Sequence, residues 1–196
     1  MSDIEVYGFS GSTYTQTVLL VAAEKGLAPV LRPLEFGAES HRVLHPFLRM
    51  PVLKHRGVRL YETAAIAVYL DEAFPGPALQ PRAPAEHALM WQWVSAAIDY
   101  AYEPLVSDLL GAGGDAGTAA ARHPAAEVLD QLEAALAGGG HLAGPAVSLA
   151  DFVLVPMLRF HLAAAGAGRP LAGRPALAAW MERMTARESC RILEAA

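Results

Sequence analysis

The first part of the chain carries short apolar runs that are separated by glycine, proline and charged residues. Runs that are β-prone and bounded by turn residues predict strands, at Ile4–Tyr7, Pro29–Leu34, Val52–His55 and Val58–Tyr61. Apolar positions at helical spacing predict helices between them, at Thr13–Lys25, Glu39–Leu44 and Thr63–Ala73. Gly26 follows the first helix and predicts its end, because glycine readily takes the left-handed conformation after a helix.

The predicted order is β-α-β-α-β-β-α. Its first half is a βαβ unit, for which parallel pairing is expected, and its second half is a hairpin closed by Arg56-Gly57. A mixed four-stranded sheet with helices on its faces satisfies both halves. We therefore predict an α/β domain over residues 1–75.

A stretch rich in proline and glycine follows and predicts a linker at 76–84. Residues 85–196 are helical by pattern and predict an all-α domain, with helices at Glu86–Leu110, Ala125–Ala137, Leu149–Ala165 and Ala176–Arg187. Pro104 is expected to kink the first of these helices, and 111–117 to interrupt the helical pattern.

Composition narrows the function classes. The chain of 196 residues is 54% hydrophobic and 18% charged, which is too apolar for a disordered chain. Its formal net charge of −5 disfavours nucleic acid as a partner, and its apolar runs are too short to cross a membrane. One cysteine, Cys190, permits no internal disulfide, and no signal peptide is recognised at the N-terminus, so we expect a cytoplasmic protein.

Two motifs lie beside the predicted hairpin. Met50-Pro51 precedes its first strand, and Glu62-Thr63 follows its second strand and opens a helix. Thr63 is expected to cap that helix, whose free N–H groups suit a carboxylate. Taken alone, Pro51 could be an ordinary strand start and Thr63 only a cap.

A third motif, Ser148-Leu149-Ala150-Asp151-Phe152, has the spacing of an N-terminal capping box with a hydrophobic staple from Val147 to Phe152. We interpret it as a structural element that starts the Leu149–Ala165 helix, and expect no ligand there. Trp91 and Trp93 are interpreted as core or interface residues, and Cys190 as a packed or surface thiol.

The ordered set of these stretches resembles the cytosolic glutathione S-transferase superfamily, in particular a serine-type, phi or bacterial-like member. The matching stretches span nearly the whole chain, from Val6-Tyr7-Gly8 with Ser12 through 45–53, 61–66 and 148–151 to the tail at 180–184. The resemblance implies a thioredoxin-like first domain in which Pro51 is cis, an all-helical second domain, and glutathione as co-substrate.

The resemblance also implies roles for individual residues. The backbone of Met50, held by Pro51, would pair with the cysteinyl part of glutathione, while Glu62 and Thr63 would hold its γ-glutamyl end. Arg49 and His41 fall near the glycyl end. Ser12 falls where serine-using classes place the catalytic hydroxyl, but the hydroxyls of Ser10, Thr13, Tyr14, Thr15 and Tyr7 are also candidates.

Further expectations concern the electrophile and the partner subunit. Contacts to an apolar electrophilic substrate are expected from residues beside the first helix and on the long helix, which in the family faces the active site across the domain cleft: Ser10, Tyr14, Tyr100, Tyr102 and Val106. Phe47 falls where several classes insert an aromatic into the other subunit, which implies a homodimer. His41 and His45 have i, i+4 spacing, but Pro46 ends the helix and no third ligand is near, so we predict no metal.

The leading hypothesis is a detoxification enzyme that activates glutathione as a thiolate for attack on an apolar electrophile. A glutathione-dependent isomerase or dehalogenase uses the same thiolate and stays open. A non-catalytic dimerisation module with this fold and a carrier of apolar ligands also stay open, because a fold does not imply an activity.

Overall fold

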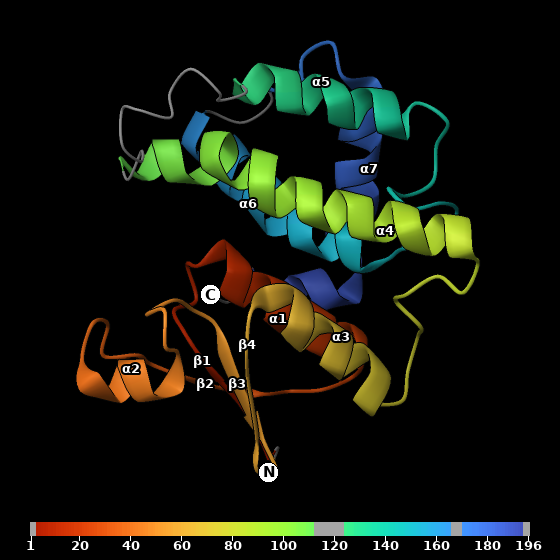
Figure 1. Cartoon of the computed structure of the whole chain (residues 1–196). Coiled ribbons are helices and arrows are strands. Elements are labelled where there is room, and N and C mark those ends of the chain that lie inside the picture. The colour runs from red at the N-terminus through yellow and green to blue at the C-terminus, as the bar shows by residue number, and fades with distance from the viewer. Residues whose placement is uncertain (1–2, 112–123, 166–169, 194–196) are drawn as a thin grey trace. The chain divides into compact units, whose positions relative to one another are not determined.

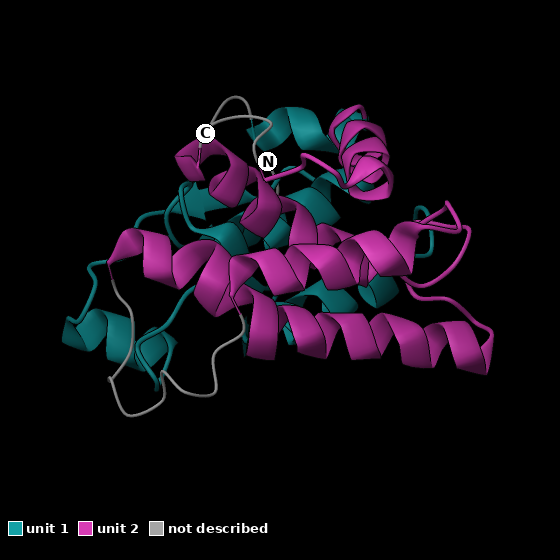
Figure 2. Ribbon diagram, turned by 90° about the horizontal axis from the view of Figure 1, so that it is seen from above, with its two compact units in different colours: residues 1–79, 187–196 teal, residues 80–186 magenta. Residues whose placement is uncertain are grey.

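The computed structural model describes residues 3–111, 124–165 and 170–193. The chain forms two compact units, residues 1–79 with 187–196 and residues 80–186, which are coloured separately in Figure 2. None of the helices in the described ranges combines the length and the apolar character that crossing a membrane requires.

The first unit has the predicted order of elements (Figure 1). They are β1 (Ile4–Tyr7), α1 (Thr13–Glu24), β2 (Val30–Arg32), α2 (Glu39–Leu44), β3 (Val52–His55), β4 (Val58–Tyr61) and α3 (Thr63–Ala73). The sheet order is β2-β1-β3-β4, with β1 and β2 parallel and the other neighbours antiparallel. The predicted mixed four-stranded sheet is thus confirmed, although β2 is shorter than the run Pro29–Leu34 from which it was predicted.

The turns of this unit follow from residues that accept a left-handed backbone. Gly26 has φ of 71° directly beyond α1, as predicted for the end of that helix. Arg56 and Gly57 both have positive φ, 45° and 84°, which is the conformation that a two-residue hairpin requires. The hairpin then fixes the register of β3 on β4.

A buried ion pair joins the end of α1 to α3, and both of its side chains also bond to the chain that follows α3. Lys25 Nζ lies 3.1 Å from Asp71 Oδ1, and the two side chains are only 2% and 6% exposed. The same ammonium donates to the Pro77 carbonyl at 2.8 Å, and the Leu79 N–H donates to Asp71 at 3.0 Å. These bonds order residues up to Leu79 within the first unit.

The end of the chain also belongs to the first unit, although residues 85–196 were expected in one helical domain. The short 3₁₀ segment η5 (Glu188–Leu193) packs on α1, and Arg187 forms an ion pair with Glu24. Cys190 on this segment is buried. The physical reason is that α1 presents apolar surface that this segment covers, which no local pattern near the C-terminus reveals.

The second unit is helical, as predicted (Figure 1). Its elements are α4 (Pro84–Ala96), η1 (Ala97–Ala101), η2 (Glu103–Ser107), η3 (Asp108–Leu110), α5 (Ala125–Leu136), α6 (Leu149–Ala165) and α7 (Pro175–Thr185). The expected helix Glu86–Leu110 is thus α-helical at first and continues as wider π turns and a final 3₁₀ turn. Pro104, which lacks an N–H, lies in the second π segment. Most of the break expected at 111–117 lies outside the described residues.

The start of α6 is held by a buried carboxylate. Asp151 accepts from the Ser148 N–H at 2.9 Å and the Ser148 hydroxyl at 3.0 Å. It also accepts from the Leu142 N–H at 3.1 Å and from Trp180 Nε1 at 2.8 Å. Asp151 therefore has the capping role predicted for it, and it additionally joins α6 to α7.

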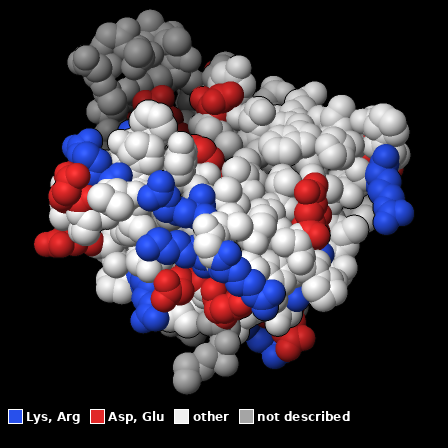
Figure 3. Space-filling model, turned by 60° about the horizontal axis from the view of Figure 1, so that its bottom comes forward, with Lys and Arg blue, Asp and Glu red and all other residues white. Residues whose placement is uncertain are grey.

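Charged side chains of opposite sign lie next to one another on the face shown in Figure 3. Exposed ion pairs of the first unit, such as Arg32 with Glu5 at 2.9 Å, have this character. Such exposed pairs are worth little stability in water.

Candidate functional site

The register of the sheet brings the sequence motifs of the first unit to one end. Val52, the first residue of β3, is paired with Tyr7 at the end of β1 and with Tyr61 at the end of β4. The segments 8–12, 49–51 and 62–63 therefore all leave the sheet at the same end. This register places the proline motif next to the helix start beyond β4, as expected for two motifs that flank one hairpin.

The Met50–Pro51 peptide bond is cis, as the resemblance implied. Pro51 is buried, Met50 is half-buried and Arg49 is exposed. Residues 49–51 lead directly into β3, so the backbone of Met50 lies at the end of the sheet where β4 passes into α3.

The helix start beyond β4 differs in one detail from the prediction. Glu62, and not Thr63, occupies the N-cap position, and no side chain caps α3. Glu62 has φ of 71° and ψ of 118°, a backbone conformation that residues other than glycine rarely adopt. Its carboxylate is exposed, whereas Thr63 is buried in the first turn. The first-turn N–H groups of α3 thus have no side-chain acceptor, and an anion would be stabilised there.

Ser12 is the N-cap of α1. Its Oγ accepts a hydrogen bond from the Thr15 N–H at 3.4 Å. Because the oxygen accepts from the backbone, the hydroxyl proton stays available to donate to a further group. The side chain is half-buried at the sheet end described above.

Tyr7 lies on the first strand but does not turn its hydroxyl toward this end. Its OH donates to Glu5 Oε2 at 2.8 Å, back along β1. Burial, together with this hydrogen bond to Glu5, raises the pKa of Tyr7 above its ordinary value. The phenol is therefore a donor to a carboxylate and is poorly placed to ionise a bound thiol.

The other hydroxyls near α1 differ in exposure. Ser10 and Tyr14 are half-buried, and the backbone carbonyl of Ser10 accepts from Gln16 Nε2 at 2.8 Å. Thr13 is 4% exposed, and Thr15 is fully buried with its Oγ1 packed against Gly8. Of these side chains, burial leaves Thr13 and Thr15 the least accessible to a ligand.

Both histidines of the α2 region are buried and bonded to backbone. His41 Nδ1 accepts from the Gly37 N–H at 3.2 Å, and His45 Nδ1 accepts from the Phe47 N–H at 3.2 Å. Burial lowers the pKa of His45, although the nearby Glu62 carboxylate opposes that shift. Within the described ranges, no three His, Cys, Asp or Glu side chains gather as a metal site would require.

Sequence reasoning missed an aromatic cluster at this end of the sheet. The His45 ring lies 4.7 Å from the Tyr61 ring, and Phe47 contacts both rings edge-on at 6.1 and 6.2 Å. Phe47 nevertheless stays 69% exposed. No local spacing signals this cluster, because His45 lies just beyond the end of α2 with extended backbone and meets Tyr61 only through the fold.

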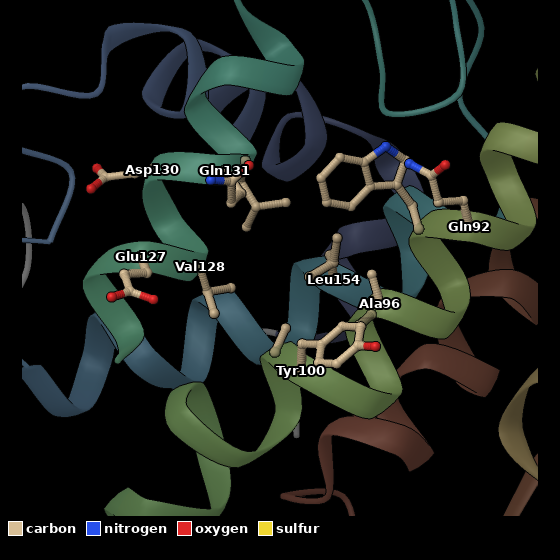
Figure 4. A pocket seen from close by; sticks show the side chains of 12 residues that line it. Gln92, Ala96, Tyr100, Glu127, Val128, Asp130, Gln131 and Leu154 are labelled. Atoms are coloured by element: carbon tan, nitrogen blue, oxygen red, sulfur yellow. The ribbon is translucent and has the colours of Figure 1, made fainter. Parts of the chain in front are cut away.

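In the second unit, the residues expected to contact the electrophile differ in exposure. Tyr100 is 57% exposed, Tyr102 is half-buried and Val106 is 3% exposed. Tyr100 lines a cavity of about 460 Å³ between α4 with η1, α5 and α6 (Figure 4).

The cavity has apolar walls and a polar edge. Val128 and Leu154 face its interior, whereas the carboxylates of Glu127 and Asp130 turn away from it (Figure 4). Trp93 is half-buried in its wall. Tyr102 and Val106 do not line this cavity, so it does not unite the expected residues.

Comparison with known proteins gives a consistent result. A family model described as "Glutathione S-transferase, N-terminal domain" matches residues 6–78, and one described as "Glutathione S-transferase, C-terminal domain" matches residues 93–188. A glutathione S-transferase of Silene vulgaris is 31% identical over 95% of this chain and 94% of its own length.

Solved structures agree in fold over nearly the whole chain. Glutathione transferase F7 of Populus trichocarpa is 26% identical, has a TM-score of 0.81, and is matched over 97% of both chains. A theta class glutathione S-transferase of Xanthomonas axonopodis pv. citri, solved with glutathione bound, is 26% identical with a TM-score of 0.78 over 97% of this chain and 96% of its own. The present chain belongs to the glutathione S-transferase family.

Proposed function

We propose that the protein is a serine-type, phi-like glutathione transferase that binds glutathione on its first unit and ionises the thiol with Ser12. The observation that carries the proposal is the pairing of Val52 with both Tyr7 and Tyr61, which gathers the three glutathione motifs at one sheet end. The relative from Xanthomonas axonopodis pv. citri that was solved with glutathione bound supports the choice of ligand.

The γ-glutamyl end of glutathione has a carboxylate and an amine, and the start of α3 offers a match for each. Free N–H groups of the uncapped first turn would bind the carboxylate, with the positive end of the helix dipole adding to the attraction. The exposed Glu62 carboxylate would bind the amine as a charge-assisted pair. The Met50 backbone would pair with the cysteinyl part, and Arg49 would lie near the glycyl carboxylate.

The thiol needs help to ionise. A free thiol has a pKa of about 8.5, and only the thiolate is the nucleophile. Lowering that pKa by about two units requires about 3 kcal/mol of preferential stabilisation of the thiolate. The Ser12 hydroxyl proton, directed at the sulfur, and the N-terminus of α1 together supply much of this.

Catalysis then consists of thiolate stabilisation and proximity. The thiolate sulfur forms a bond to an electrophilic carbon, and the leaving group departs with the electron pair of the bond that breaks. The thiol proton leaves to water when the thiolate forms. No metal or further cofactor is needed for these steps.

The proposed contacts to the electrophilic substrate are Ser10, Tyr14, Tyr100, Tyr102 and Val106. We also propose a cytoplasmic homodimer with a role in detoxification. The ring of Phe47 is exposed on one side and contacts the rings of His45 and Tyr61 on the other. This arrangement supports packing of Phe47 against helices of a second copy.

The test is conjugation of glutathione to 1-chloro-2,4-dinitrobenzene by wild type and Ser12→Ala. We expect kcat/KM to fall well over tenfold, with a loss of about 1 kcal/mol or less in stability because the cap bond is long. Ser95→Ala, which removes an exposed hydroxyl on α4, is the matched control. Unchanged activity of Ser12→Ala would remove Ser12 from the mechanism and move the search to Ser10 or Tyr14.

Calorimetry separates the competing functions. Absence of glutathione binding at millimolar concentration would favour a non-catalytic module with this fold. Binding without conjugation would favour a glutathione-dependent isomerase or dehalogenase, because those reactions use the same bound thiolate.

A further inference from the structure

His41 is placed to hold the chain that leads into Met50. It lies in the middle of α2, and its side chain is fully buried. Its Nε2 lies 2.9 Å from the carbonyl oxygen of Arg49, the residue directly before Met50. Its Nδ1 accepts from the Gly37 N–H at 3.2 Å.

These partners define the protonation of the ring. A carbonyl oxygen can only accept, so Nε2 must carry a proton. A backbone N–H can only donate, so Nδ1 must be unprotonated. His41 is therefore a neutral imidazole with both nitrogens bonded to backbone, and its tautomer follows from its neighbours.

The two bonds join the segments on either side of α2. Gly37, with φ of 84°, lies in the turn before α2, and Arg49 lies in the stretch after it. The ring of Phe36 packs on the imidazole at 5.0 Å. His41 thus fastens both flanks of α2 to one another behind the Arg49–Met50 backbone.

We infer that His41 is a positioning residue for glutathione: it fixes the backbone at Arg49 and Met50 and does not itself contact the ligand. This inference rests on the proposed glutathione site. It differs from the expectation that His41 is a ligand of the glycyl carboxylate, because a ligand would need a ring nitrogen that is not already bonded.

Two amide substitutions separate the two bonds. In His41→Gln the amide nitrogen falls near the position of Nε2 and can still donate to the Arg49 carbonyl. In His41→Asn the amide oxygen falls near Nδ1 and can accept from Gly37, but no donor reaches Arg49. Ser40→Ala, an exposed change on the same helix, is the control.

The experiment measures the affinity of each variant for glutathione and for γ-glutamylcysteine amide, which lacks the glycine. We expect His41→Asn to weaken both ligands about tenfold, which corresponds to about 1.4 kcal/mol and to the order of one hydrogen bond. The value of kcat at saturating glutathione should change less than threefold. His41→Gln and Ser40→Ala should stay within about threefold of wild type for both ligands.

The outcomes are distinct. A loss confined to glutathione and absent for γ-glutamylcysteine amide would show that His41 contacts the glycyl end, and would overturn the inference. Equal affinities of His41→Asn and wild type, or equal losses in His41→Gln and His41→Asn, would also overturn it. Failure of wild type to bind glutathione at all would overturn the proposed function itself, and the inference with it.

Discussion

Gly8 lies so close to Thr15 that only a residue without a side chain fits there. Because the Thr15 N–H donates to Ser12 Oγ, a larger residue at position 8 should also disturb Ser12. A Cβ added at Gly8 would lie 2.4 Å from Thr15 Oγ1 and 3.2 Å from Thr15 Cγ2. Ordinary contact begins at 3.4 Å, so Gly8→Ala creates an overlap of 1.0 Å with the oxygen. Thr15 is fully buried, and rotating its side chain would exchange the hydroxyl for the methyl group at the same place.

The expected magnitude follows from overpacking of a buried site, which costs about 1–3 kcal/mol. Thr15→Ala removes both clashing atoms and leaves only its Cβ, 3.4 Å from the new methyl group, so the double variant Gly8→Ala/Thr15→Ala should regain most of the loss. Thr15→Val keeps the shape and therefore the clash. As a single substitution with Gly8 unchanged, Thr15→Val should leave the unfolding free energy unchanged or raise it, because Thr15 Oγ1 has no hydrogen-bond partner in the described structure.

Urea denaturation followed by far-UV circular dichroism is the assay, because Trp91, Trp93 and Trp180 all lie in residues 80–186 and do not report on the first unit. Since the Thr15 N–H donates to Ser12 Oγ, the Gly8→Ala variant should also lose conjugation activity, and Thr15→Ala should restore it. A Gly8→Ala variant as stable as wild type, or a double variant that is no better than the single one, would refute this packing argument.

Other predictions concern buried groups. Lys25→Met leaves the buried Asp71 carboxylate without the Lys25 ammonium and should cost about 3–5 kcal/mol of unfolding free energy. The double variant Lys25→Met/Asp71→Leu should recover much of that loss, and a denaturation midpoint no higher than that of Lys25→Met would contradict this. Asp151→Asn turns an amide NH₂ group toward donors and should cost about 2–3 kcal/mol of unfolding free energy, measured by urea unfolding followed by tryptophan fluorescence; an unshifted midpoint would refute it. Burial lowers the pKa of His161 below its ordinary 6.5, so the unfolded state binds more protons and stability is lost as pH falls through the folded pKa. Unfolding free energies from pH 7 to 5.5 should therefore fall more steeply in wild type than in His161→Gln, and equal slopes would count against a buried neutral ring.

Much of the first unit could be predicted from local patterns. The bounds of β1, α2, β3, β4 and α3 are those that the sequence predicted, because period-two and helical spacing reflect burial on one face of a short element. The Arg56-Gly57 turn fixed the hairpin register and, with it, the closeness of Pro51 and Glu62. These features depend on residues that are near one another along the chain.

The long helix of the second unit was only partly predicted. Helical spacing over Glu86–Leu110 indicated the path of the chain but could not show that its second half winds as π turns around Pro104. The N-cap of α3 was misplaced by one residue for a related reason. The sequence rule favours the hydroxyl of Thr63, whereas the geometry of the strand end makes Glu62 the residue that turns.

The sequence by itself determined the elements, their order and the motifs that meet at one end of the sheet, because each is encoded within a few residues or one hairpin. Only the tertiary structure decided that the Tyr7 hydroxyl turns to Glu5, that His41 bonds both ring nitrogens to backbone, and that the chain end packs on α1. The chain end and α1 are far apart in sequence, whereas Tyr7 and Glu5 are only two residues apart and His41 and Arg49 only eight. In each case several groups are candidates, and a buried polar group takes whichever partner the packed fold brings within hydrogen-bond distance.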